Sequence, residues 1–379
     1  MAGPPGGPRV ISVAVTHRFD GFTLDAAFDA PAGVTALFGR SGAGKTTLVD
    51  AIAGLIRPDS ARIALGDRVL ADTARGIHLP PHRRRVGYVF QHARLFPHMT
   101  VAANLAYGRR DATDTDRIVD MLDIGPLRDR RPATLSGGER SRVAIGRALL
   151  SSPDLLLMDE PLASLDAGRK AEILPYLARL RDEARLPILY VSHSLPEIAQ
   201  LATTLVLLEA GRVVRAGPLT DLLSDPALVT ALGVRDAGAV LTGRVTVRAP
   251  DGLAEIAISG GTLTVADPGL PVGAAVRIRI EAQEVILSAA LPVGLSALNV
   301  LAGTIDSLHA GGGPGTMVRV RVGDAALLAR ITRRSAVAMD LAPGQAIHAI
   351  VKTVAVSPDD IGGMGNGGGA GRDNPTGGC

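Results

Sequence analysis

Residues 34–55 read VTALFGRSGAGKTTLVDAIAGL, and this stretch decides the fold of the first half of the chain. The five residues VTALF predict a buried strand. The loop that follows fits the pattern G-x-x-x-x-G-K-[ST], whose glycines let backbone N–H groups point at one anion. The residues TTLVDAIAGL predict a helix whose positive N-terminal end faces the same point. This order of strand, loop and helix predicts an α/β domain that binds phosphate groups.

The phosphate loop contains the residues expected to contact a nucleotide. Lys45 is expected to place a positive charge beside the β and γ phosphates, and the Thr46 hydroxyl is expected to hold Mg²⁺. The predicted nucleotide-binding residues of the loop are Gly39, Arg40, Ser41, Gly42, Ala43, Gly44, Lys45, Thr46 and Thr47.

A second apolar run, LLLM at residues 155–158, is followed by Asp159 and Glu160. A run without polar residues predicts a core strand, which would deliver both acids beside the phosphates. We expect Asp159 to reach Mg²⁺ and Glu160 to polarise an attacking water, because phosphoryl transfer depends on positioning the nucleophile. Two surface acids after an exposed strand are the alternative, but such a strand would carry polar residues.

The stretch LSGGERSRVAIGRALL, residues 135–150, predicts a second anion site. Ser136 can cap a helix, and the two glycines after it expose backbone N–H groups at the helix N-terminus. One γ-phosphate does not need two such sites in one subunit. We therefore expect this site to serve a nucleotide held by another copy of the chain, the plainer alternative being a capped helix with a glycine turn.

These segments, in this order, resemble the ABC ATPases, in which two cassettes sandwich two ATP molecules head to tail. The resemblance implies a homodimer with ATP and Mg²⁺ as cofactors. It implies catalytic roles for Glu160, His193 and Gln91, and Mg²⁺ contacts from Thr46, Gln91 and Asp159. It implies contacts to the partner's ATP from Ser136, Gly137, Gly138, Glu139 and Asp166, the last in a loop with Ser164 and Leu165. Phe19 is the candidate for stacking on adenine, whereas Phe22 is more typical of a core residue.

The 379 residues predict two or three domains. A nucleotide-binding domain is expected over residues 1–233, with antiparallel edge strands within 61–79 and a helical subdomain within 101–150. The patch LFPHMTV at 95–101 resembles the groove that receives a helix of a membrane subunit, although in an isolated domain it would be core. The basic run at 82–85 predicts a solvated loop.

Short β-branched segments separated by Gly and Pro follow residue 236 and predict a small, OB-like β-barrel region. We expect its first half at 234–290, a barrel domain at 291–358 and a disordered Gly-rich tail at 359–379. The fold class is therefore α/β: a P-loop ABC cassette with a helical subdomain, followed by a small all-β domain.

Three segments of this region, at 296–308, 330–335 and 344–356, resemble the oxyanion-binding domain of molybdate-responsive proteins. Two segments of the cassette are similar to those of molybdate importer ATPases, namely GYVFQHARLFPHMTVAANLAYG and LYVSHSLPEI. Hydroxyls, N–H groups and a cation hold a tetrahedral dianion best. The candidates are Ser296, Asn299, Thr332, Lys352 and Thr353. Leu298 stands where the family often has Arg, and ordinary barrel residues are the alternative reading.

Composition narrows the class of protein. The single cysteine, Cys379, rules out a disulfide framework or a Cys-based zinc site. The net charge is +3, from 40 basic and 37 acidic residues. This near balance gives no indication that the chain binds nucleic acid. No run of about 18 apolar residues occurs, so we expect neither a signal peptide nor a membrane span, and any channel would be another chain.

The sequence thus predicts the ATPase subunit of an ABC importer for molybdate, peripheral on the cytoplasmic face of the inner membrane. The expected partners are integral permease subunits and, indirectly, a periplasmic or surface anion-binding protein. An importer of sulfate, tungstate or another small solute is the nearest alternative. A soluble ABC ATPase acting on DNA or ribosomes would carry long coiled coil, zinc cysteines or two cassettes, and an oxyanion store or sensor would leave the cassette unexplained.

Overall fold

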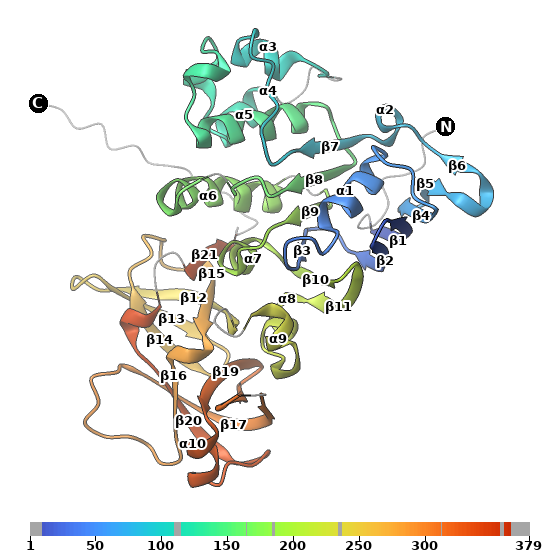
Figure 1. Ribbon diagram of the computed structural model, residues 1–379. Coiled ribbons are helices and arrows are strands. Elements are labelled where there is room, and N and C mark those ends of the chain that lie inside the picture. Colours follow the sequence, from blue (N-terminus) through green and yellow to red (C-terminus); the bar gives the residue numbers. More distant parts are fainter. Residues whose placement is uncertain are drawn as a thin grey trace, which may run out of the picture.

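The computed structural model describes residues 10–109, 115–163, 165–183, 186–233, 237–311, 313–356 and 360–364. Three layers follow one another in Figure 1: a helical subdomain, a large sheet with its helices, and a C-terminal β domain. None of the described helices is long and apolar enough to cross a membrane.

The large sheet has eleven strands in the order β6-β5-β4-β1-β2-β11-β10-β3-β9-β8-β7. Along the chain these are β1 (Ile11–Phe19), β2 (Phe22–Ala30), β3 (Val34–Phe38), β4 (Ser60–Leu65), β5 (Arg68–Asp72), β6 (Ile77–His78), β7 (Val86–Val89), β8 (Leu155–Asp159), β9 (Ile188–Val191), β10 (Thr204–Glu209) and β11 (Arg212–Pro218). The strands β10, β3, β9, β8 and β7 are parallel, so their carboxyl ends lie on one edge. The predicted antiparallel edge is confirmed in β4, β5 and β6.

Both faces of the central strands β3, β8 and β9 are buried, which explains their largely apolar sequences. Every residue of β3, β8 and β9 is buried. Leu155 and Leu157 of β8 belong to the core that includes α1 (Lys45–Ala53), whereas Leu156 and Met158 face the core on the opposite side. Side chains therefore alternate between two cores, as the pleat of a strand requires.

Helices cover both faces of the sheet. Beyond α1 the cassette contains α2 (Pro81–Arg84), α3 (Val101–Ala106), α4 (Thr115–Met121), α5 (Gly137–Leu150), α6 (Ala167–Glu183), α7 (Leu195–Leu201), α8 (Leu219–Leu223) and α9 (Val229–Leu232). The packing of α3 and α4 against α5 confirms the predicted helical subdomain, which is drawn at the top of Figure 1.

The C-terminal domain consists of two five-stranded sheets, ordered β14-β13-β12-β15-β21 and β16-β20-β17-β18-β19. The strands are β12 (Gly238–Arg248), β13 (Leu253–Ile258), β14 (Gly261–Ala266), β15 (Ala275–Glu281), β16 (Val285–Ser288), β17 (Asn299–Ala310), β18 (Gly315–Val322), β19 (Ala325–Thr332), β20 (Ala346–Val351) and β21 (Ile361–Met364), with α10 (Arg333–Ala338) after β19. One apolar core contains residues of both sheets. Because β16 pairs with β20, the predicted boundary at residue 290 cuts through a sheet.

The prediction of a disordered tail from residue 359 is wrong for residues 361–364. They form β21, which pairs antiparallel with β15. Backbone hydrogen bonds hold this strand, so it needs few apolar side chains. A Cβ at Gly362 would lie 3.2 Å from the side chain of Gln200 on α7, so glycine permits this close approach. Residues 365–379, with Cys379, lie outside the described part of the chain.

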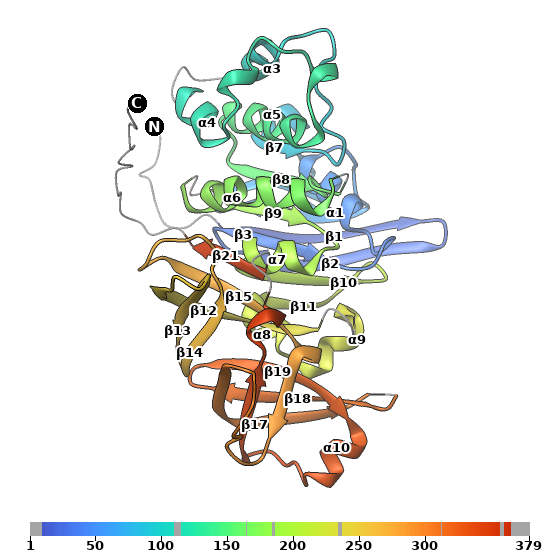
Figure 2. The same cartoon turned by 90° about the vertical axis from the view of Figure 1, so that its left-hand side faces the viewer.

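The β domain packs against the helix α7 through β15 and β21, as both views of the molecule show (Figure 2). Arg277 of β15 donates to the Ala202 carbonyl over 2.5 Å, and Arg181 of α6 donates to the Gly363 carbonyl over 3.3 Å. Burial lowers the pKa of Arg277 to about 10, so it stays charged at neutral pH. Helix α7 therefore contacts both domains.

The basic run at 82–85 is not entirely a solvated loop, because Arg84 is fully buried with 0% exposure. Its guanidinium donates to the carbonyls of Ala51 and Ile52, both over 2.8 Å, and to that of Leu79 over 2.7 Å. Burial lowers the pKa of Arg84 to about 10. The charge thus lies at the C-terminal end of α1, where the helix dipole favours a cation.

We expect Arg84→Met to destabilise the chain by roughly 2–3 kcal/mol, because several buried carbonyls lose a charged donor. Urea denaturation measures the free energy of unfolding. The exposed neighbour Arg83 supplies the control, and Arg83→Met should change stability by less than about 0.5 kcal/mol. If the two substitutions lowered the free energy of unfolding equally, the stabilising role of the buried Arg84 guanidinium would be contradicted.

Candidate functional site

The phosphate loop lies between β3 and α1, as predicted. Gly42 and Gly44 have φ angles of 81° and 95°, in the left-handed region that favours glycine. The Lys45 ammonium is buried and donates to the carbonyls of Gly39 over 2.6 Å and Arg40 over 3.1 Å. Burial lowers the pKa of Lys45, while Glu160 and Asp159 oppose this shift. The loop therefore concentrates one positive charge and the N-terminus of α1 at one place.

Asp159 ends β8 and faces the start of α1. The Thr46 hydroxyl donates to the Asp159 carboxylate over 3.4 Å, across 113 residues of sequence. Burial raises the pKa of Asp159, and the nearby Glu160 charge adds to this effect. Among the described residues no group of three His, Cys, Asp or Glu side chains gathers around a point. A carboxylate and a hydroxyl instead suit a hard cation that takes its other ligands from phosphate and water.

Glu160 and His193 meet at the same edge. His193 Nδ1 lies 3.3 Å from Glu160 Oε1, and the two side chains are 60% and 21% exposed. Glu160 has a φ of 45°, a strained value for a residue with a side chain, and its N–H donates to the Val191 carbonyl over 3.0 Å. The turn after β8 therefore aims the carboxylate at the loop that carries His193.

Gln91 is exposed just beyond β7, the strand next to β8. The sequence analysis missed a contact beside it: Tyr88 of β7 donates to Asp50 of α1 over 2.9 Å. Burial, with the Asp159 and Asp50 charges, raises the pKa of Tyr88 far above its usual range, so the phenol stays protonated. This bond links the strand before Gln91 to the helix that follows the phosphate loop.

Ser136 caps α5 in a reciprocal arrangement with Glu139. The Ser136 hydroxyl accepts from the Glu139 N–H over 3.2 Å, and the Ser136 N–H donates to the Glu139 carboxylate over 2.6 Å. This hydrogen bond and Arg130 lower the pKa of Glu139. A Cβ at Gly137 would lie 2.6 Å from the end of the Leu165 side chain, so a larger residue there would have to displace Leu165. The predicted helix cap is thus present.

Two further candidates flank the site. Phe19 is 45% exposed and lies opposite Phe22, with 6.2 Å between the ring centroids. Phe22 packs against the phosphate loop, because its ring would be 2.9 Å from a Cβ at Gly44. Asp166 directly precedes α6, and its carboxylate accepts from the Arg169 N–H over 3.0 Å. Ser164, named with it, lies outside the described residues.

The oxyanion candidates do not form one cluster within a chain. Asn299 is buried, and its amide exchanges two hydrogen bonds with the Thr264 backbone, of 2.6 and 2.9 Å, so it joins β17 to β14. Thr332 pairs with Gly315, which places it at the opposite end of β17 from Asn299. Its hydroxyl caps α10 by accepting from the Ser335 N–H over 3.0 Å. The five-residue set is therefore wrong as a single site in one chain.

The remaining three candidates lie near the start of β17. Asn299 pairs with Val351, the residue before Lys352 and Thr353. Ser296 and Lys352 are exposed, whereas the Thr353 hydroxyl is buried without a hydrogen-bond partner among the described residues. Leu298 is 59% exposed, so a longer side chain there would extend into solvent.

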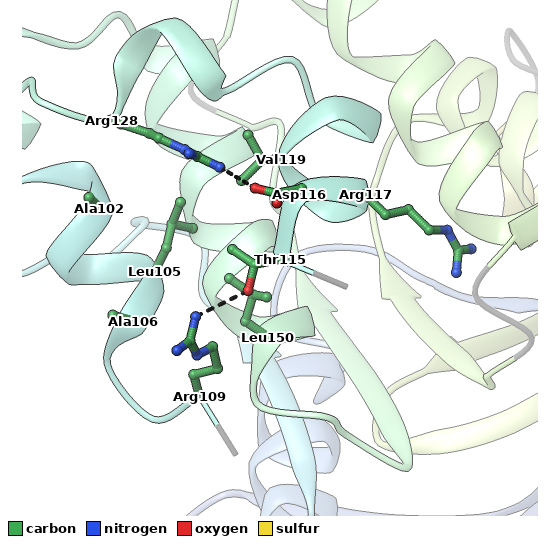
Figure 3. A pocket seen from close by; sticks show the side chains of 10 residues that line it. All are labelled: Ala102, Leu105, Ala106, Arg109, Thr115, Asp116, Arg117, Val119, Arg128 and Leu150. Atoms are coloured by element: carbon green, nitrogen blue, oxygen red, sulfur yellow. Dashed lines mark hydrogen bonds and ion pairs between the residues drawn. The ribbon is translucent and has the colours of Figure 1, made fainter. Parts of the chain in front are cut away.

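Figure 3 shows a pocket of about 560 Å³ in the helical subdomain, away from the strand ends. Leu105 and Val119 supply apolar lining, and Arg128 pairs with Asp116 over 2.8 Å at its edge. Arg117, by contrast, points away from the hollow toward Glu183, which it contacts over 3.5 Å. None of the predicted nucleotide-binding residues lines this pocket.

The ABC transporter family profile matches residues 25–163, and that of the TOBE domain matches 295–358. The chain is similar to the molybdenum import ATP-binding protein ModC of Mesorhizobium japonicum, with 49% identity over 91% of this chain and 95% of the relative. The ModC of Rhizobium etli is 51% identical over 91% of this chain and 98% of its own. A nucleotide-free ATP-binding cassette of an ABC transporter shares the fold, with a TM-score of 0.51 and 23% identity over 58% of this chain and 97% of that chain.

We expect Glu160→Gln to lower the rate of ATP hydrolysis by about 10²- to 10⁴-fold while nucleotide binding persists, because a positioned base is lost and the phosphate loop is unchanged. Phosphate release and equilibrium dialysis measure the two quantities. The exposed acid Glu172 on α6 serves as the control, and Glu172→Gln should hydrolyse ATP at the wild-type rate. If Glu160→Gln hydrolysed ATP at nearly the wild-type rate, the assignment of Glu160 as the positioned base would be contradicted.

Proposed function

The chain belongs to the family of molybdenum import ATP-binding proteins, and we propose that it works as a homodimer on the cytoplasmic face of the inner membrane, beneath a permease. The chain hydrolyses ATP and thereby energises the import of molybdate. One observation carries the chemical part of this proposal: the phosphate loop, Asp159, Glu160 and His193 meet at one strand edge.

Phosphate binding rests on charge and backbone geometry. Lys45 moves from the carbonyls of Gly39 and Arg40 to the β and γ oxygens, and the N–H groups at the start of α1 bind the same phosphates. Phe19 stacks on the adenine, which its exposure beside the phosphate loop permits.

A magnesium ion fits the pair formed by Thr46 and Asp159, whose oxygens lie 3.4 Å apart beside the loop. Gln91, at the end of the neighbouring strand, is the third residue we assign to it. When bound, the ion would neutralise charge on the β and γ phosphates. Burial raises the pKa of Asp159, and a cation beside it would oppose this shift by favouring the charged carboxylate.

Hydrolysis is assigned to Glu160 and His193. The Glu160 carboxylate accepts a hydrogen bond from the attacking water and holds it in line with the γ-phosphate. His193, 3.3 Å from that carboxylate, fixes its direction and contacts the γ-phosphate. The strained turn at Glu160 is consistent with a side chain held in position for a task.

The homodimer follows from the second anion site. The start of α5, a helix of 14 residues, is formed by Ser136, Gly137, Gly138 and Glu139. The capping box uses the N–H groups of Ser136 and Glu139, and we assign those of Gly137 and Gly138 to the ATP of the partner. Asp166, exposed at the start of α6, is assigned to the same interface. Each ATP would then lie between one phosphate loop and the opposite α5.

We expect Ser136→Asp to abolish hydrolysis although it can still cap α5, because its charge repels the partner's phosphates. Mixed with inactive Lys45→Ala chains, it should restore activity to about a quarter of wild type, since half of the dimers contain one intact composite site. Phosphate release at several mixing ratios measures this. As a control, Ser136→Asp chains must bind ATP normally, because Lys45 is unchanged. If heterodimers are shown to form but have no activity, the proposal that each composite site works independently is contradicted.

The patch at 95–101 is the proposed contact with the permease. Leu95, Phe96 and Met99 are half-buried, and Asn104 fixes the loop by accepting from the Phe96 N–H over 2.8 Å and donating to its carbonyl over 3.1 Å. Because this patch follows Gln91 closely in the chain, a permease helix there could sense the nucleotide site.

An oxyanion contact in the β domain is a separate proposal. Lys352 supplies a cation, and Ser296 and Thr353 supply hydroxyls near the same end of β17. The Thr353 hydroxyl finds no hydrogen-bond partner in the described part of the chain, which supports a polar ligand there. The import activity does not depend on this assignment.

In vesicles that contain the permease and this chain, we expect ATP-dependent uptake of labelled molybdate when the anion-binding protein delivers it. Glu160→Gln chains should give no uptake above the ATP-free level, because the ATPase provides the energy. Competition with unlabelled sulfate and tungstate identifies the anion. Uptake that sulfate abolishes at equal concentration would favour the alternative of a sulfate importer.

A further inference from the structure

Glu197, on α7, is a buried carboxylate that the mechanism above does not use. Only 5% of the residue is exposed. Its Oε2 accepts from the hydroxyls of Ser192 over 2.8 Å and Tyr190 over 3.0 Å, and its Oε1 accepts from Lys170 over 2.8 Å. Three donors from two segments, the C-terminal end of β9 and the start of α6, therefore converge on one carboxylate.

The bond to Ser192 places this network beside His193. The Ser192 hydroxyl donates to Glu197 and accepts from the Ser194 N–H over 3.0 Å. It therefore ties together the two residues that flank His193 and attaches them to α7. His193 itself is 60% exposed, so packing alone does not orient its ring. The flanking backbone sets the position from which the imidazole reaches Glu160.

The bond to Lys170 connects a second functional segment. Lys170 lies on the first turn of α6, and its N–H donates to the Asp166 carbonyl over 3.0 Å. Asp166 is the residue assigned above to the dimer interface. Glu197 thus joins the helix that follows Asp166 to the loop that carries His193.

We propose that Glu197 is a positioning residue for hydrolysis, which fixes the His193 loop through Ser192 and couples it to the start of α6 through Lys170. It touches neither substrate nor attacking water, and it acts through His193. The inference rests on the ATPase activity of the site and not on the identity of the transported anion.

Replacing Glu197 by Gln removes the charge and leaves a single acceptor oxygen. If that oxygen faces Ser192 and Tyr190, the amide NH₂ meets the Lys170 ammonium, and two donors then oppose each other. If it faces Lys170, the two hydroxyls lose their acceptor. Either orientation breaks one arm of the network, whereas the phosphate loop keeps all its contacts.

The test measures kcat and KM for ATP in the full-length chain. We expect Glu197→Gln and Ser192→Ala each to lower kcat about tenfold and to leave KM within about twofold. In a His193→Ala background the same substitutions should lower the residual rate by less than about twofold, because the residue through which they act is gone. Single-turnover experiments over hours give access to the slow rates.

The matched control is Ser224→Ala. Ser224 is as buried as Ser192, and it follows the last residue of α8. Its hydroxyl donates to the Thr220 carbonyl over 2.8 Å, outside this network. Ser224→Ala should leave kcat unchanged and should lower the melting temperature about as much as Ser192→Ala does. Losses of kcat that persist in full without His193, or an unchanged kcat in Ser192→Ala, would overturn the proposal. Should Glu197→Gln fail to fold, Ser192→Ala decides the matter.

Discussion

The parallel register of β7, β8, β9 and β3 is the constraint on which the site depends. Asp159 pairs with Val191, so Glu160 bonds to the same strand end and His193 follows two residues later. A slip of one residue would also exchange every side chain of β8 between the two cores. The apolar packing that stabilises the cassette therefore fixes the distances at its catalytic edge as well.

Local signals made much of this predictable from sequence. The unbroken apolar runs of β3 and β8, the glycine loop and the cap at Ser136 each depend on neighbours within a few residues, and the structure confirms them as elements. The resemblance to the ABC ATPases then supplied the expected roles of these elements. Local pattern alone could not show that Gln91 and His193 lie at the same edge of the sheet, because strand order is a long-range property.

The residues whose contacts the sequence analysis did not predict have a physical cause in common. Arg84 resembles its exposed neighbours in sequence and differs only because the end of α1 lies against it. Asn299 and Thr332 carry suitable polar groups, but Thr264 and the start of α10 already bind them. The network around Glu197 was equally hidden, since Ser194 and Glu197 suggest an ordinary cap while the carboxylate turns toward Ser192 and Lys170. Apart from the local cap at Thr332, a partner distant in the sequence decides each role.

The strand β21 also bears on the order in which the chain can assemble during synthesis. Its partners, β15 and the helices α6 and α7, all leave the ribosome well before residues 361–364 do. The cassette core can form early, because domains generally fold as units while translation proceeds. The edge of β15, however, keeps open hydrogen-bonding groups until β21 arrives. The junction between the two domains is therefore completed last, and the nascent chain carries an uncovered strand edge until then.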